Sequence, residues 1–166
     1  MKKLILLLAL CLLTTVGGQA QEAFKEIYNL SNKTLIDNKE DKEVRKVALF
    51  KVDALVYMNT KFLEVLLDST KQHSYNVMAR RDSMAYYMYD YVNLFTKEYA
   101  RVNKKAEKDR ILKIFRDASI NSPLFNDPDR EYVLSYYNRE DFLTQFSLDT
   151  DWVKANAIVR RKLGQK

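Results

Sequence analysis

The sequence predicts an all-α protein: a helical bundle built on a long antiparallel helix hairpin, with additional shorter helices toward the carboxyl terminus. Two observations support this prediction. Apolar residues recur at three- and four-residue steps along most of the 166-residue chain, and no segment alternates convincingly as a strand does. Glycine and proline, which interrupt helices, are scarce, because only Gly164, Pro123 and Pro128 lie beyond residue 20.

The first 20 residues have the pattern of an export signal. Two lysines precede an apolar run from Leu4 to Leu13, and Gly18-Gln19-Ala20 places small residues where a signal peptidase cuts. The apolar run is shorter than the ~20 residues that span a bilayer. We therefore expect a removable signal at 1–20, one helical domain at 21–166 and no transmembrane segment in the mature chain. The expected location is the periplasm, the outer-membrane surface or the medium.

The first expected helices are a short lead-in helix over residues 22–37 and a long helix over residues 43–69, separated by a polar break. The long helix carries apolar side chains on most of its circumference, including a second seam through Val56, Leu63 and Leu67. Such a helix needs several neighbours to cover it, so we expect it at the centre of the core.

A narrow polar stripe on the long helix runs through Lys46, Asp53 and Thr60. Residues 71–74 predict a turn, after which apolar residues return at helical spacing over residues 77–102. Two long helices joined by a short polar turn are expected to pack as an antiparallel hairpin.

The remaining helices are predicted to be shorter. Residues 111–118 predict a helix that stops before Pro123, because the residue before proline disfavours helical geometry. After a loop at 119–128, residues 132–137 predict a short helix, and Phe142, Leu143 and Phe146 predict another helical turn. Asp149-Thr150-Asp151 is expected to cap a final helix that begins near Trp152.

Composition excludes several kinds of site. Beyond residue 20 the chain has no cysteine and a single histidine, His73, which excludes disulfides, cysteine nucleophiles, Cys/His zinc sites and paired-histidine metal centres. The scarcity of glycine excludes a phosphate-binding loop and a dinucleotide fingerprint. Asp127, Asp129 and Glu131 resemble the start of a calcium loop, but Tyr132 stands where that loop needs glycine. We therefore expect no catalytic, metal or cofactor-binding residues.

Tyrosine is the most unusual feature of the composition, and it predicts a candidate partner-binding surface. Tyr91 lies on the predicted core stripe of the second long helix, whereas Tyr86 shares its face with polar residues and is expected to meet solvent. In the simplest interpretation, most of these tyrosine rings pack at the edge of the core. The alternative is an aromatic platform for a sugar, a peptide or a protein, formed by Tyr86 and Tyr89 with Arg80 and Arg81.

Charge is distributed unevenly along the chain. Removing two lysines with the signal leaves 26 basic against 22 acidic residues, a net charge of +4. The order is a basic segment at 97–116, an acidic one at 117–151 and a basic carboxyl terminus. In the simplest interpretation, the acidic segment folds between the two basic ones and offsets their repulsion. The alternative is an anion-binding surface formed by basic residues of both basic segments: Arg101, Lys104, Lys105, Lys108, Arg160 and Arg161.

The export signal and the composition together resemble the small, exported, all-helical proteins of unknown function found in Gram-negative bacteria. This resemblance implies no functional residues. The leading hypothesis is a non-enzymatic binding or scaffold domain of the cell envelope, with another envelope protein as its partner. Recognition of an anionic envelope polymer or lipid head group is the second hypothesis, and an enzyme based on carboxylates or tyrosine is the third. The exported location argues against nucleic acid.

Overall fold

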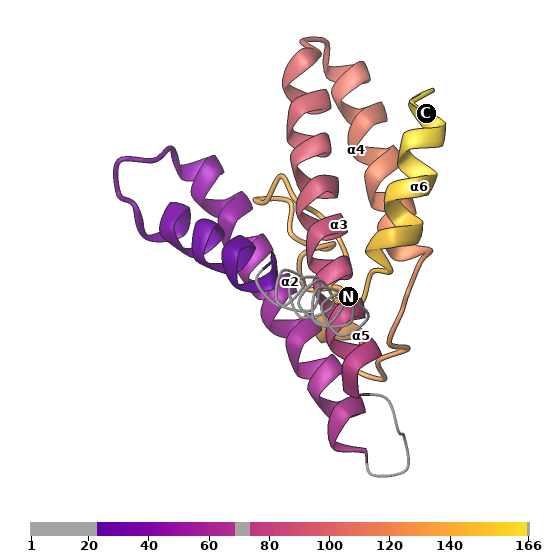
Figure 1. The fold of residues 1–166 in the computed structure, drawn as a ribbon. Helices are drawn as coiled ribbons and strands as arrows, with labels where there is room; N and C mark the ends of the chain where they lie inside the picture. The colour runs from indigo at the N-terminus through magenta and orange to yellow at the C-terminus, as the bar shows by residue number, and fades with distance from the viewer. Residues whose placement is uncertain (1–22, 69–73, 166) are drawn as a thin grey trace, which may run out of the picture.

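The computed structural model describes residues 23–68 and 74–165, and within them it confirms the all-α fold (Figure 1). A helix over residues 23–36 is followed by five labelled helices: α2 (Lys42–Leu67), α3 (Ser74–Arg101), α4 (Lys105–Ile120), α5 (Arg130–Val133) and α6 (Trp152–Lys162). The predicted export signal and His73 lie outside the described residues. None of the described helices has the length and hydropathy needed to cross a bilayer.

The two long helices form the predicted hairpin, in which α2 and α3 run in opposite directions and pack together (Figure 1). Asp41 begins α2 as its N-cap, because its carboxylate accepts a hydrogen bond from the backbone N–H of Glu43. The expectation that neighbours cover both apolar seams of α2 is wrong at Val56, Leu63 and Leu67, which are 47%, 43% and 83% exposed.

The centre of the core lies at α3. The apolar circumference of α2 had predicted that α2 would occupy this position. The α3 helix packs against α2, α4 and α6, and α4 also packs against α6. At this junction Tyr91 is fully buried, with its ring centroid 5.1 Å from Phe115 and 5.4 Å from Trp152. Its hydroxyl donates a 2.6 Å hydrogen bond to the backbone oxygen of Phe115, which satisfies the one polar atom of that side chain.

The segment between α4 and α6 is mostly irregular, and the predicted helical turn at residues 142–146 is wrong. Phe142 and Phe146 have the spacing of a helix, and both are buried, but they reach the core from irregular backbone. Hydroxyl and carboxylate side chains supply hydrogen bonds just beyond this stretch, at Ser147, Asp149 and Thr150. The short helix predicted over residues 132–137 is likewise reduced to α5, followed by turns.

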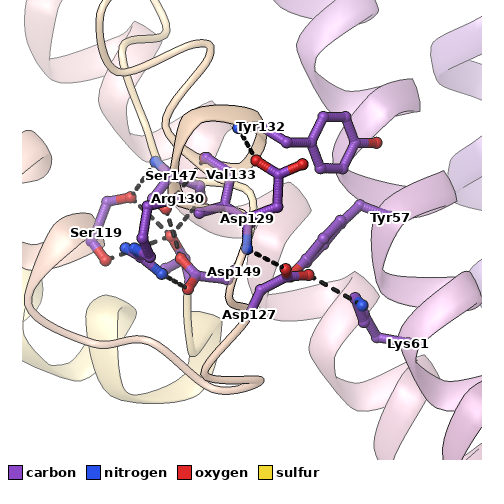
Figure 2. Close-up of polar contacts among 11 residues, drawn as sticks. Tyr57, Lys61, Ser119, Asp127, Asp129, Arg130, Tyr132, Val133, Ser147 and Asp149 are labelled. Atoms are coloured by element: carbon purple, nitrogen blue, oxygen red, sulfur yellow. Dashed lines mark hydrogen bonds and ion pairs between the residues drawn. The ribbon is translucent and has the colours of Figure 1, made fainter.

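Buried polar side chains hold this irregular segment against the end of α4 (Figure 2). The hydroxyl oxygens of Ser119 and Thr150 lie 2.7 Å apart, and the backbone N–H of Ser147 donates a 2.7 Å hydrogen bond to Ser119 Oγ. Asp149 accepts from the Ser147 hydroxyl and forms an ion pair with Arg130 of α5. The segment thus has a defined path without regular backbone pairing.

A second polar group ties the same segment to α2. The carboxylate of Asp127 accepts hydrogen bonds of 2.9 Å from the Tyr57 hydroxyl and 3.0 Å from the backbone N–H of Asp129, and its ion pair with Lys61 Nζ measures 2.9 Å (Figure 2). The Lys61 ammonium is the largest influence on Asp127 and lowers the pKa of its carboxyl. Burial, with Asp127 next in importance, raises the pKa of the Tyr57 hydroxyl.

Candidate functional site

A pocket of about 410 Å³ lies between the 23–36 helix, α2 and α3. Its aliphatic lining comes from the 23–36 helix, α2 and the irregular segment: Leu30, Val44, Val47, Ala48 and Leu143. Val44 is 45% exposed and Leu30 is 50% exposed, so these two side chains stand at the rim, whereas Val47 and Ala48 are buried at the base. The pocket therefore combines an open mouth with an apolar interior.

Helical spacing explains why these residues share one pocket. The α2 residues 44, 47, 48 and 51 follow the i, i+3, i+4, i+7 pattern of one helix face, and the α3 residues 89, 93 and 96 follow i, i+4, i+7. The 23–36 helix covers the pair from one side, where Arg45 Nε donates a 2.9 Å hydrogen bond to the Leu35 backbone oxygen.

Lys51 is the group in the pocket with the most unusual surroundings. Its Nζ donates a 2.7 Å hydrogen bond to Asn93 Oδ1 and lies 4.5 Å from the centre of the Tyr89 ring. Within the described part of the chain, no carboxylate lies within 4.0 Å of this ammonium. Burial lowers the pKa of Lys51 to about 8, so the ammonium still predominates at pH 7. Its positive charge has a neutral amide and an aromatic face as partners.

The acidic residue at the pocket rim does not balance this charge. Glu43 forms a 3.0 Å ion pair with Lys46, one turn further along α2. The two opposite charges at the rim therefore offset each other, and the uncompensated charge of the pocket is that of Lys51.

Ser31, on the helix that covers the pocket, has an unsatisfied hydroxyl. The side chain is 3% exposed, and its Oγ has no hydrogen-bond partner among the described residues. The other two hydroxyls of the lining are satisfied by their own helices, since Thr34 Oγ1 donates to the Leu30 oxygen and Thr96 Oγ1 donates to the Asn93 oxygen. Leaving a buried hydroxyl unpaired costs about 1–3 kcal/mol. A ligand that accepts a hydrogen bond from Ser31 would recover that energy.

The predicted partner-binding tyrosines lie close together on α3 but in different surroundings. Tyr89 lines the pocket beneath the Lys51 ammonium. Tyr86 is 57% exposed, as expected, and its ring meets the edge of Tyr87 at 5.7 Å. The expected burial of Tyr91 is also confirmed.

The two arginines predicted to assist the tyrosines do not lie beside them. Arg81 is 8% exposed, donates to Asp82 Oδ1 and Asn59 Oδ1, and stacks 4.4 Å from the centre of the Phe24 ring. Arg80 is exposed and lines a smaller hollow near the start of α6. The structure thus brings together only the tyrosines of this predicted set.

The six predicted anion-binding residues come from two segments that lie at the same end of the bundle (Figure 1). Gln165, just after α6, donates to Glu98 near the end of α3, which places the carboxyl terminus beside the α3–α4 turn. Three of the six have carboxylate partners: Arg101 with Glu98, Lys105 with Asp109, and Arg160 with Asp90. Lys108 Nζ lies 5.0 Å from the centre of the Tyr99 ring, and Lys104 and Arg161 are exposed.

The polar groups of Figure 2 satisfy one another and serve the fold. Ser119, Ser147 and Thr150 are fully buried, and Asp149 is 1% exposed. Each of these side chains has a hydrogen-bond or ion-pair partner within the group. The described residues also contain no group of three or more histidine, cysteine, aspartate or glutamate side chains that could hold a metal ion.

Lys51, Ser31 and Asn93 line the pocket, although the sequence did not predict them as site residues. A signal for Lys51 exists, because this residue lies on the side of α2 opposite the polar stripe through Lys46 and Asp53. A lysine on an apolar helix face indicates either a buried partner or a binding site. For Ser31 and Asn93 the sequence offers no comparable signal, since ordinary amphipathic helices contain such residues at partly buried positions.

No family model, no curated protein and no solved structure matches this chain.

Proposed function

We propose that this protein is a non-enzymatic binding domain of the bacterial cell envelope, and that it holds a small ligand in the pocket between the 23–36 helix, α2 and α3. The volume of about 410 Å³ falls in the range of small-molecule sites, which combine apolar walls with a few converging polar groups. The observation that carries the proposal is the Lys51 ammonium, whose charge has no carboxylate partner among the described residues. The envelope location rests on the predicted export signal.

The pocket chemistry favours binding over catalysis. General acid–base catalysis needs titratable groups placed around one reacting atom. The other ionisable side chains that line this pocket are Glu43, which Lys46 engages, and Tyr89, whose ring faces Lys51. A single ammonium surrounded by apolar walls orients a ligand but provides no second group to exchange protons with it.

Two substitutions on α2 test the proposal as a matched pair. Val44 stands at the pocket rim, and Val56 lies three turns away on the same helix with a similar exposure, 45% against 47%. Val44→Trp should fill the mouth of the pocket, whereas Val56→Trp adds the same ring outside it. Each purified protein would be incubated with envelope extract and examined by native mass spectrometry.

The proposal predicts a small-molecule adduct on the wild type and on Val56→Trp that is lost or strongly reduced on Val44→Trp. Equal adducts on all three proteins would place the ligand elsewhere. The complete absence of a small-molecule adduct from the wild type would contradict a ligand-binding function.

A second candidate function is recognition of anionic lipid head groups or envelope polymers at the end of the bundle where the α3–α4 turn meets the end of α6. The Gln165–Glu98 contact favours this second function, because the contact joins two basic segments that are distant in the sequence. Binding to anionic vesicles should weaken as salt is raised. The charge reversals Lys104→Glu and Lys108→Glu should reduce it more than the same reversals at Lys39 and Lys42.

A further inference from the structure

We propose that the pocket ligand is a monocarboxylic acid with an apolar body, whose carboxylate lies against Lys51 and whose body lies against Val47, Ala48 and Leu143. This inference rests on the proposed function, since it names the ligand class of the same pocket.

The sign of the ligand charge follows from the charges that line the pocket. Glu43 and Lys46 offset each other at the rim, and Lys51 remains without an ionic partner among the described residues. A buried charge is costly unless it is paired. One negative charge on the ligand would pair with Lys51. A second negative charge would be left beside Glu43 without a cation, so a monoanion fits better than a dianion.

The hydrogen-bonding groups of the pocket also match a carboxylate, because the unsatisfied groups can all donate. The Lys51 ammonium has three N–H groups, and the hydrogen bond to Asn93 uses one of them. Since an ammonium only donates, Asn93 must accept with its Oδ1, which leaves its Nδ2 as a donor without a partner among the described residues. Ser31 Oγ supplies a third donor. A carboxylate offers two oxygens that accept hydrogen bonds in several directions.

The apolar body follows from the walls and the volume. Five of the twelve lining residues are aliphatic, and they come from α2, from the 23–36 helix and from the irregular segment. The volume of about 410 Å³ holds roughly a dozen heavy atoms at the ~30 Å³ that each water occupies in the liquid. Formate or acetate would leave most of these walls in contact with water, whereas a straight-chain acid of about this size would cover them.

Three probes of equal chain length test the ligand class by isothermal titration calorimetry: decanoate, decanol and decylamine. The variant Lys51→Met keeps the length and apolar stem of the lysine, and Lys113→Met removes an exposed lysine of α4 as a control. Decanoate should bind the wild type and the control alike, and about tenfold or more tighter than decanol, which is the usual effect of a charge-assisted hydrogen bond. Decylamine should bind most weakly. Lys51→Met should weaken decanoate by about tenfold or more and leave decanol unchanged.

A second variant, Ser31→Ala, keeps the test informative if Lys51→Met alters folding. It should weaken decanoate binding by about tenfold or more, as expected for one hydrogen bond to a charged group, while thermal stability is retained. The inference is overturned if decanol or decylamine binds as tightly as decanoate, or if neither variant changes the preference for the acid.

The failure of this inference is distinguishable from that of the proposed function. If none of the three probes binds, but Val44→Trp still removes an adduct found in envelope extract, the pocket binds another class of ligand and only the carboxylate assignment is overturned. If the probes do not bind and no adduct depends on Val44, both proposals are overturned.

Discussion

Lys51 Nζ donates a 2.7 Å hydrogen bond to Asn93 Oδ1 across the interface of α2 and α3, so a neutral amide occupies the position where a carboxylate would balance the lysine charge. The Tyr89 ring, 4.5 Å away, adds an aromatic face but no negative charge. Cation–π contacts contribute about 0.5–2 kcal/mol, less than the cost of desolvating an ammonium. Asn93 and Tyr89 therefore hold the Lys51 ammonium in position without neutralising its charge.

The first prediction concerns stability against pH. Burial lowers the pKa of Lys51 from 10.5 to about 8, so between these two values the unfolded chain binds more protons at this site than the folded one. The contribution of Lys51 to the free energy of unfolding consequently rises with pH across that window, by at most about 3 kcal/mol. The stability advantage of Lys51→Met over the wild type should shrink between pH 8 and 10.5. Urea unfolding of both proteins over that range measures it, and a constant difference would contradict the lowered pKa.

The second prediction uses the amide partner. Asn93→Asp should place a carboxylate against Lys51, raise the pKa of the lysine and neutralise the pocket. An NMR titration of the Lys51 side chain should show the rise, and decanoate should lose most of its affinity. The same substitution at the exposed Asn103, beyond α3, should leave the pKa of Lys51 and the affinity for decanoate unchanged. Tight decanoate binding to Asn93→Asp would show that the charge of Lys51 does not select the ligand.

The third prediction compares two fully buried threonines of the irregular segment. Thr150 Oγ1 donates to the Ser147 backbone oxygen and lies 2.7 Å from Ser119 Oγ, whereas Thr144 Oγ1 has no partner among the described residues. Thr150→Val should lower the free energy of unfolding by about 1–3 kcal/mol, because it leaves buried polar groups unpaired. Thr144→Val removes an unpaired hydroxyl and should be neutral or stabilising. Equal effects on urea unfolding would contradict the hydrogen bonds assigned to Thr150.

The fourth prediction concerns Asp127, which joins the irregular segment to Lys61 and Tyr57 of α2. Lys61 holds the pKa of the Asp127 carboxyl below its usual range, so its ionised form stabilises the fold above about pH 4. That stabilisation is lost as pH falls through the lowered pKa. Asp127→Asn should be less stable than the wild type at pH 7, and the difference should disappear in acid. Thermal unfolding from pH 2 to 7 tests this, and a difference that stays constant over that range would contradict it.

The sequence predicts the hairpin well because α2 and α3 carry long, uninterrupted helical spacing, and local periodicity alone determines such elements. It fails at Phe142 and Phe146, whose spacing is helical although their backbone is not. There the path depends on contacts such as that between Ser119 and Thr150, which are 31 residues apart in sequence. Periodicity contains no information on such distant partners.

The same physical reason explains what could be predicted of the site. The cluster of tyrosines on one helix predicts Tyr89 as a candidate, and Tyr89 lines the pocket. The roles of Lys51 and Asn93 depend on the packing of α2 against α3, because these two residues are 42 positions apart in the sequence. The roles of Ser31 and Leu143 depend on how the 23–36 helix and the irregular segment dock on that pair. Tertiary packing creates the pocket, so its lining cannot be inferred from single elements.

Docking of the 23–36 helix completes the pocket. Helices of this length are marginal in isolation, so its persistence depends on docking contacts such as Arg45 to the Leu35 oxygen and Arg81 on the Phe24 ring. Ser31 and Leu30 contribute to the pocket only while the helix is docked. A ligand in this pocket would therefore stabilise the docked helix, because the undocked form lacks part of the binding site. Amide hydrogen exchange in residues 23–36 should slow when the pocket is filled, while exchange in α4 remains at its unliganded rate.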